Sequence, residues 1–171
     1  VSDDATFDVT NVSSTAQVGS SGTVAVTVEN SGQTTAYDAD ITLETKNEEL
    51  TFGERTRSTR TAGPWAPGET RTFEYDVTAS DDAQAESYPF SLSVAFDNPD
   101  GVRKQSSSAS VSVTPDPEQS FSLSTVDSSL RVGEERTITT SVTNNGPRAV
   151  SNVVVNWESD KSNFSPQETQ I

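Results

Sequence analysis

Cysteine, histidine and methionine are all absent from this chain of 171 residues. The lack of cysteine excludes disulfide bonds, a thiol nucleophile and thiolate metal ligands. The lack of histidine removes the most common general base and the most common zinc ligand. The chain also has no glycine-rich phosphate loop, no nucleophile elbow and no apolar run near the roughly 18 residues that span a membrane. We therefore expect a chain that is not an enzyme and that uses no cofactor.

Basic residues are few, with 11 Lys and Arg against 26 Asp and Glu, and the formal net charge is -15. Nucleic acid is therefore not an expected partner. The lysines are limited to Lys46, Lys104 and Lys161, and 30% of the residues are hydrophobic. Such a composition is typical of proteins from salt-loving organisms, because molar salt reduces the range of like-charge repulsion from roughly 30 Å to about 3 Å. Disorder is the alternative interpretation of this composition, but the strict alternation described below argues against it.

The chain repeats itself at one spacing. Phe7–Val12 recurs as Phe121–Val126, an offset of 114 residues. The same offset relates further pairs: Val18-Gly19 and Val132-Gly133, Val24 and Ile138, Val28 and Val142, Asn30 and Asn144, Gly32 and Gly146, Asp38 and Asn152, Ile41 and Val155. Because solenoid repeats have periods of about 20 to 50 residues, this offset indicates one domain present twice.

Six segments of the first copy alternate apolar and polar residues, as half-buried strands do. They are Phe7–Val12, Val24–Val28, Ala39–Leu43, Phe73–Val77, Tyr88–Phe96 and Ala109–Val113, with a possible short strand around Leu50 and Phe52. Gly, Asn and Pro mark the turns between them, and helical periodicity is absent. The sequence therefore predicts an all-β fold of tandem immunoglobulin-like antiparallel β-sandwiches, without the cysteine pair and core tryptophan of antibody domains.

The repeat also predicts the domain boundaries. Residues 1–114 form a complete sandwich, residues 115–120 form a proline-containing linker that acts as a semi-rigid spacer, and residues 121–171 form the N-terminal half of a second domain.

In the second copy we expect strands at 121–126, 137–143 and 152–157, followed by a turn at 165–169. Counterparts of the last three strands of the first copy are missing, which leaves an open sheet edge and an uncovered apolar face. We therefore hypothesise that the chain is a piece of a longer array, or that another chain supplies the missing strands.

The first copy contains five motifs in a fixed order: Val18-Gly19, Val24–Gly32, Ala36–Leu43, Ala66–Thr70 and Ser87–Asp97. Their order and spacing resemble the Ig-like modules of archaeal surface-layer-type proteins, relatives of the adhesion-associated CARDB modules. The resemblance covers residues 5–115 and the first half of the second copy. It implies an extracellular protein, haloarchaeal by its composition, that is attached to the cell envelope and has no catalytic activity of its own.

Two sequons are candidate glycosylation sites, with Asn11 and Asn163 as the acceptors. Their middle residues are apolar and are expected to point inward, which would leave Asn and Ser accessible. Chance occurrence in a chain rich in Ser and Thr explains them equally well. Asp97 and Asp100 are weak calcium candidates, because calcium needs 6 to 8 oxygen ligands and this turn lacks the spacing of a calcium loop. A solvated acidic turn is the favoured interpretation, so we expect no specific metal site.

An island of positive charge, Arg55, Arg57 and Arg60, interrupts the acidic sequence. Its arginines could contact an acidic face of a neighbouring copy or an anionic glycan, because a guanidinium binds carboxylate or sulfate through two hydrogen bonds. Pairing with the chain's own carboxylates is the simpler explanation. Trp65 follows closely and could stack on a sugar ring, although a loop tryptophan more often plugs the end of a sandwich.

These observations together predict a non-catalytic extracellular module, structural or adhesive, of a cell-surface or surface-layer-associated protein. Its expected partners are other cell-surface proteins, copies of itself or glycans, and it would reach a membrane only through an anchor outside this segment. One alternative is a carbohydrate- or protein-binding accessory module of a larger secreted enzyme, with Trp65 and the Arg55 loop as its binding face. Another is a filament or sheath subunit that neighbouring chains complete.

Overall fold

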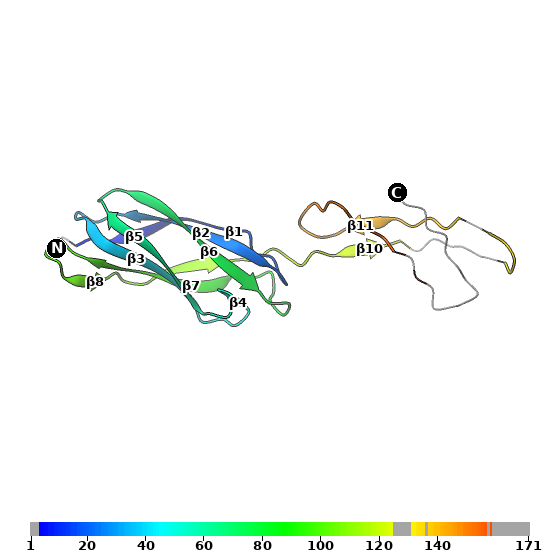
Figure 1. The fold of residues 1–171 in the computed structure, drawn as a ribbon, viewed down its shortest axis with the longest axis horizontal. Helices are drawn as coiled ribbons and strands as arrows, with labels where there is room; N and C mark the ends of the chain where they lie inside the picture. The colour runs from blue at the N-terminus through cyan, green and yellow to red at the C-terminus, as the bar shows by residue number, and fades with distance from the viewer. Residues whose placement is uncertain (1–3, 125–130, 136, 157, 159–171) are drawn as a thin grey trace. The chain divides into compact units, whose positions relative to one another are not determined.

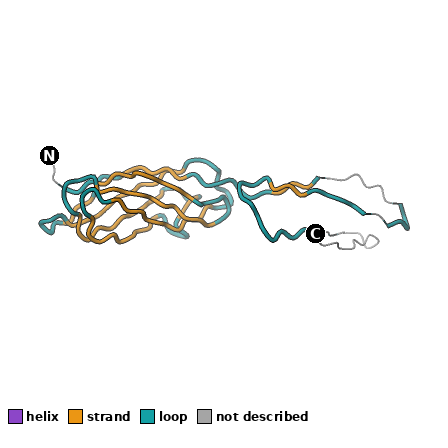
Figure 2. Tube along the Cα trace, turned by 90° about the horizontal axis from the view of Figure 1, so that it is seen from above, coloured by secondary structure: helices purple, strands orange, loops and turns teal. Residues whose placement is uncertain are grey.

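A computed structural model describes residues 4–124, 131–135, 137–156 and 158, and it divides the chain into two units, Val1–Glu118 and Gln119–Ile171. This division falls inside the segment predicted as the linker. No helix occurs among the described residues (Figures 1 and 2), and all pairs of strands are antiparallel. The predicted all-β class is confirmed.

The first unit contains two packed sheets (Figure 1). One sheet has the order β1-β2-β6-β4, formed by Phe7–Ser14, Ser21–Asn30, Thr70–Ala79 and Leu50–Thr51. The other has the order β5-β3-β7-β8, with β9 also paired to β7, formed by Arg57–Trp65, Ala36–Thr45, Tyr88–Asp97, Arg103–Gln105 and Ala109–Val113. This order of strands confirms the predicted immunoglobulin-like sandwich.

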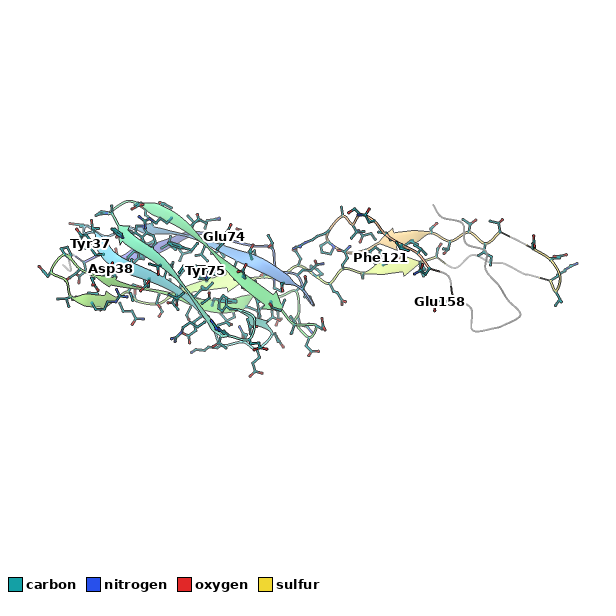
Figure 3. All side chains as sticks on the ribbon, in the orientation of Figure 1. Tyr37, Asp38, Glu74, Tyr75, Phe121 and Glu158 are labelled. Atoms are coloured by element: carbon teal, nitrogen blue, oxygen red, sulfur yellow. The ribbon has the colours of Figure 1, made fainter. Side chains whose placement is uncertain are left out.

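The core lies between the two sheets, because alternate residues of each strand point inward. In β2, β6 and β7 the buried positions follow this period of two. Tyr75 of β6 crosses the core and donates its hydroxyl hydrogen to Ile41 O of β3 (3.1 Å), and burial raises its pKa above the ordinary value. Its ring lies 6.1 Å from the ring of Phe52. The neighbouring Glu74, labelled beside Tyr75 in Figure 3, is exposed.

Strand β5 was not among the predicted strands, and it corrects the interpretation of Trp65 as a loop residue. It pairs with β3 along most of its length, but the residues at its half-buried positions Ser58 and Arg60 are polar, so the apolar alternation that marks a strand is missing. Gly63-Pro64, inside the strand, also resembles a turn in the sequence. Strand β8 was missed for a similar reason, since all of its residues are exposed. The short predicted strand near Leu50 is confirmed as β4.

In the second unit, β10 (Phe121–Leu123) pairs with β11 (Val142–Asn144). The predicted strands are longer than those observed: residues 137–141 and 152–156 are not in strands, while residues 125, 126, 157 and 165–169 lie outside the described part. The counterpart of 152–156 in the first unit is β3, which pairs with β5 on one side and β7 on the other. No described residue of the second unit forms either of those flanking strands, so this segment has no ladder to join.

The internal repeat extends to individual hydrogen bonds. Asn30 donates from Nδ2 to Thr34 O (3.0 Å), and its Oδ1 accepts from the backbone N–H two residues later (3.1 Å). Asn144, 114 residues further on, donates from Nδ2 to Arg148 O (2.7 Å) and accepts from the backbone N–H two residues later (2.9 Å). In both copies, the strand that ends at this asparagine is therefore followed by the same asparagine-stabilised loop.

Left-handed backbone conformations recur at the same offset. Asp38 has φ 44° and Asn152 has φ 57°, while Gly19 has φ 72° and Gly133 has φ 81°. Asp and Asn are among the few residues other than glycine that adopt this region readily. The burial is not shared, because Val155 is 47% exposed where its counterpart Ile41 is fully buried. The described part of the second unit thus leaves uncovered an apolar face that the first unit buries.

Candidate functional site

The first unit has a groove of about 610 Å³ at the edge where the two sheets meet. Its walls come from β5 on one side and from β6 and the turn after β4 on the other. The charged residues that line it are Arg55, Arg57, Arg60 and Asp76, which gives this groove a formal charge of +2 in a chain whose net charge is -15. The groove therefore favours an anionic ligand.

Arg60 crosses from β5 to β6 at the groove. Its Nε donates to Glu74 O (3.0 Å), its guanidinium carbon lies 5.2 Å from the centre of the Tyr75 ring, and a terminal nitrogen lies 4.0 Å from an Asp76 oxygen. The aliphatic part of an arginine can cover apolar surface while its charged end stays in water. Arg60 thus covers the core at a position where a strand would ordinarily place an apolar residue.

Arg71 crosses in the opposite direction, from β6 to β5. Its terminal nitrogens donate to Ala62 O and to Pro64 O, the latter at 2.7 Å, and its guanidinium carbon lies 5.5 Å from the centre of the Trp65 ring. The carboxylate of Glu69 holds Arg71 in place through Nε (2.8 Å). This hydrogen bond, followed by one from the backbone N–H of residue 66, lowers the pKa of Glu69 below its ordinary value. The C-terminal half of the β5 edge is therefore occupied by a side chain.

The N-terminal half of the same edge is open. Because Thr45 N–H donates to Thr56 O (2.8 Å), the alternation of an antiparallel ladder directs the backbone groups of Ser58 toward β3 and those of Arg57 and Thr59 away from it. Within the described residues, no backbone hydrogen bond reaches the outer side of Arg57 or Thr59. The groove thus exposes a short segment of unpaired strand edge.

The three arginines of the predicted island differ in their partners. Arg57 forms an ion pair with Glu44 (3.0 Å) in which the side chains are 64% and 41% exposed, so the pair is weak and open to exchange with another carboxylate. Arg60 is occupied by its contacts with Glu74 O and the Tyr75 ring on the other sheet. In the part of the chain that the structure describes, the guanidinium of Arg55 makes no ion pair and no hydrogen bond. Arg55 and Arg57 are thus the arginines available to a ligand.

Trp65 is not available to a sugar ring. The interpretation of this residue as an exposed contact is therefore wrong, and the alternative, that it fills the interior of the sandwich, agrees with its burial. It ends β5 with no exposed surface, packs against the rings of Phe7 (5.0 Å between centroids) and Phe73 (5.4 Å), and donates Nε1–H to Glu69 O (2.8 Å). A tryptophan therefore does stand in this core, but it comes from β5, whereas antibody domains supply it from the strand that corresponds to β3. The alternative of a glycan-binding face built on Trp65 loses its aromatic platform.

The calcium candidates lie in a hairpin turn in which side-chain oxygens of Asp97 and Asn98 already have partners. Asp97 contacts Arg103 (3.2 Å), which also contacts Asp40 (3.0 Å), and these carboxylates, Asp97 first, raise the pKa of Arg103. The side-chain oxygen of Asn98 accepts from Asp100 N–H (3.1 Å) and from the N–H two residues later (2.8 Å). Among the described residues, no group of three or more acidic side chains is placed to hold a metal ion.

The first sequon lies on β1, an edge strand. Asn11 and Ser13 are exposed and Val12 is half-buried, directly after a bulge in the pairing with β2. An accessible asparagine on a sheet edge has the exposure that glycosylation requires. The second sequon, at Asn163, lies outside the described residues.

No family model and no curated protein matches this chain. Among solved structures, the cohesin module of a family 33 glycoside hydrolase from Clostridium perfringens is 16% identical, with a TM-score of 0.47 over 68% of this chain and 100% of its own. The major pilin subunit of Bacillus cereus is 11% identical (TM-score 0.40; 83% and 54% covered). A GH20 exo-β-N-acetylglucosaminidase from Vibrio harveyi is 15% identical (TM-score 0.43; 72% and 20% covered). With scores this low, the likenesses carry no inference about function.

Proposed function

We propose that this chain is a non-catalytic structural and adhesive module of an extracellular, surface-layer-associated protein. The observation that carries the proposal is the groove beside β5, which combines positive charge with an open strand edge in an otherwise acidic sandwich. Such an edge suits the binding of another protein. The resemblance of the sequence to archaeal surface-layer-type modules supports the location on a cell surface.

The connection at the end of the first unit supports a load-bearing role. Asp116 N–H donates to Ala16 O (2.9 Å), and Val18 N–H donates to Asp116 O (3.0 Å), which forms an isolated parallel bridge between the segment after β1 and the segment after β9. Force applied through the chain at residue 116 therefore acts first on hydrogen bonds that hold the end of the unit together. A spacer between other domains would need this feature.

Surface labelling of intact cells tests the location. Lys46 and Lys104 are exposed, so a membrane-impermeant amine-reactive biotin reagent is expected to modify both on intact cells that express the protein. Mass spectrometry of the tryptic peptides gives the extent of labelling at each lysine. Labelling that appears only after cell lysis would refute the extracellular assignment, and a cytoplasmic protein measured in the same sample controls for lysis.

A further inference from the structure

We propose that the open half of β5 binds an extended acidic peptide segment of a partner protein, which pairs with the edge as an additional strand. The proposal deepens the adhesive function described above and rests on it.

Unpaired backbone groups are the first observation behind this inference. The N–H and C=O groups of Arg57 and Thr59 point away from β3 into the groove, and an extended peptide can pair with them as a strand pairs with any sheet edge. The arrangement also limits the length of the added strand. Arg71 occupies the carbonyls of Ala62 and Pro64, so the added ladder ends before residue 62.

Charge is the second observation. Arg55 lies in the turn that leads into β5 and has no ion-pair or hydrogen-bond partner for its guanidinium among the described residues. Arg57 lies on the strand itself, with its side chain 64% exposed. A guanidinium binds carboxylate through two hydrogen bonds, so alternate acidic side chains of an added strand have partners here. The same two arginines would repel a basic peptide.

The polarity of the groove favours a peptide over a glycan. Trp65 is buried, and the aromatic side chain that lines the groove, Phe52, is only 9% exposed. A sugar would therefore find no ring to stack on within the groove. The small polar residues Ser58 and Thr78 line the walls instead.

Fluorescence anisotropy with a defined peptide tests the inference. The probe is a fluorescein-labelled peptide of alternating Glu and Val, titrated with the full chain in dilute buffer. We expect saturable binding that a Lys-Val peptide does not show and that N-methylation of alternate peptide bonds in the probe abolishes. Arg55→Gln and Arg57→Gln are each expected to weaken binding by about three- to tenfold.

Thr59→Pro distinguishes strand pairing from simple charge attraction. Proline removes the outward N–H of Thr59 but is tolerated on an edge strand where that group faces solvent, so we expect binding about tenfold weaker with the fold retained. Thr59→Ala is the matched control, because it removes the hydroxyl contact with Thr42 (2.9 Å) and keeps the backbone N–H. Circular dichroism establishes whether each variant is folded, and the Arg55→Gln result stands even if the proline variant is not.

Three results would overturn the proposal: no binding of the Glu-Val peptide at millimolar concentration, equal binding of its N-methylated form, or competition by a sulfated oligosaccharide together with unchanged affinity of Thr59→Pro. The last result would identify the groove as a general anion site. Any of these results leaves the cell-surface labelling of Lys46 and Lys104 unaffected, so failure of the peptide site and failure of the proposed function are separable.

Discussion

Replacing Trp65 with alanine is expected to lower the free energy of unfolding of the first unit by about 3 to 5 kcal/mol, the largest effect of any single truncation in this sandwich. The indole has no exposed surface and contacts the rings of Phe7 and Phe73. Its removal leaves a cavity in the core and deprives Arg71 of the ring beneath its guanidinium. Urea denaturation of the full chain, followed by far-ultraviolet circular dichroism, measures the change.

Two further variants show whether burial causes this effect. Trp65→Phe keeps an aromatic ring in the core and loses the Nε1–H donor to Glu69 O, so its expected cost is about 1 to 2 kcal/mol. Tyr37→Ala truncates an aromatic residue that is 46% exposed at the start of β3 (Figure 3) and should change stability by less than about 1 kcal/mol. If Trp65→Ala were as mild as Tyr37→Ala, the indole would have to lie at the surface.

The second large effect is expected from Asn30→Asp. Asn30 is fully buried and donates from Nδ2 to Thr34 O (3.0 Å) and to Trp65 O (2.9 Å). A carboxylate at this position would face two carbonyl oxygens without a proton to donate, so we expect a loss of about 3 kcal/mol or more at neutral pH. Burial and these carbonyls both disfavour the charged form and would raise the pKa of the introduced carboxyl in the folded state. The variant's deficit in stability should therefore be largest at neutral pH and should shrink as the pH falls and the carboxyl becomes protonated.

The chain provides its own control for this variant. Asn144 makes the corresponding hydrogen bonds to Arg148 O and from the N–H two residues later, but it is exposed. Asn144→Asp is therefore expected to change stability by less than about 1 kcal/mol at any pH, because water solvates the carboxylate. Denaturation curves of both variants at neutral and acidic pH provide the comparison. Equal effects at the two positions, or a deficit at Asn30 that does not depend on pH, would show that burial of Asn30 is not what matters.

The sequence predicted those strands that alternate apolar and polar residues. Such alternation arises where a strand has one face on the core, as in β2 and β7, and the predicted centres of those strands lie within the observed bounds. Strand β5 escaped prediction because Arg60 covers the core with its aliphatic stem and a cation-π contact with Tyr75. A hydrophobicity pattern counts such a residue as exposed because of its charge, so the strand that carries it is not recognised.

The candidate site was predictable only in part. The arginine island is visible in the sequence, but the groove depends on three-dimensional facts, namely that Arg57–Trp65 is an edge strand and that β6 lies opposite it. Which arginines are available also depends on the fold, since Arg60 is committed to Glu74 O, while Arg57 has only an exposed, exchangeable ion pair with Glu44. The position of Trp65 in the core required the same knowledge, because it packs against Phe7, which is distant in sequence, and Phe73, which lies on the opposite sheet.

Amide hydrogen exchange along β5 in the free chain tests most directly the central claim that this strand is an edge whose N-terminal half is open. The ladder directs the N–H groups of Ser58 and Arg60 toward β3 and those of Arg57 and Thr59 into the groove. We therefore expect slow exchange at Ser58 and Arg60 and exchange close to that of an unstructured peptide at Arg57 and Thr59. Protection of Arg57 and Thr59 equal to that of Ser58 would mean that the edge is already paired, and the proposed binding surface would not exist.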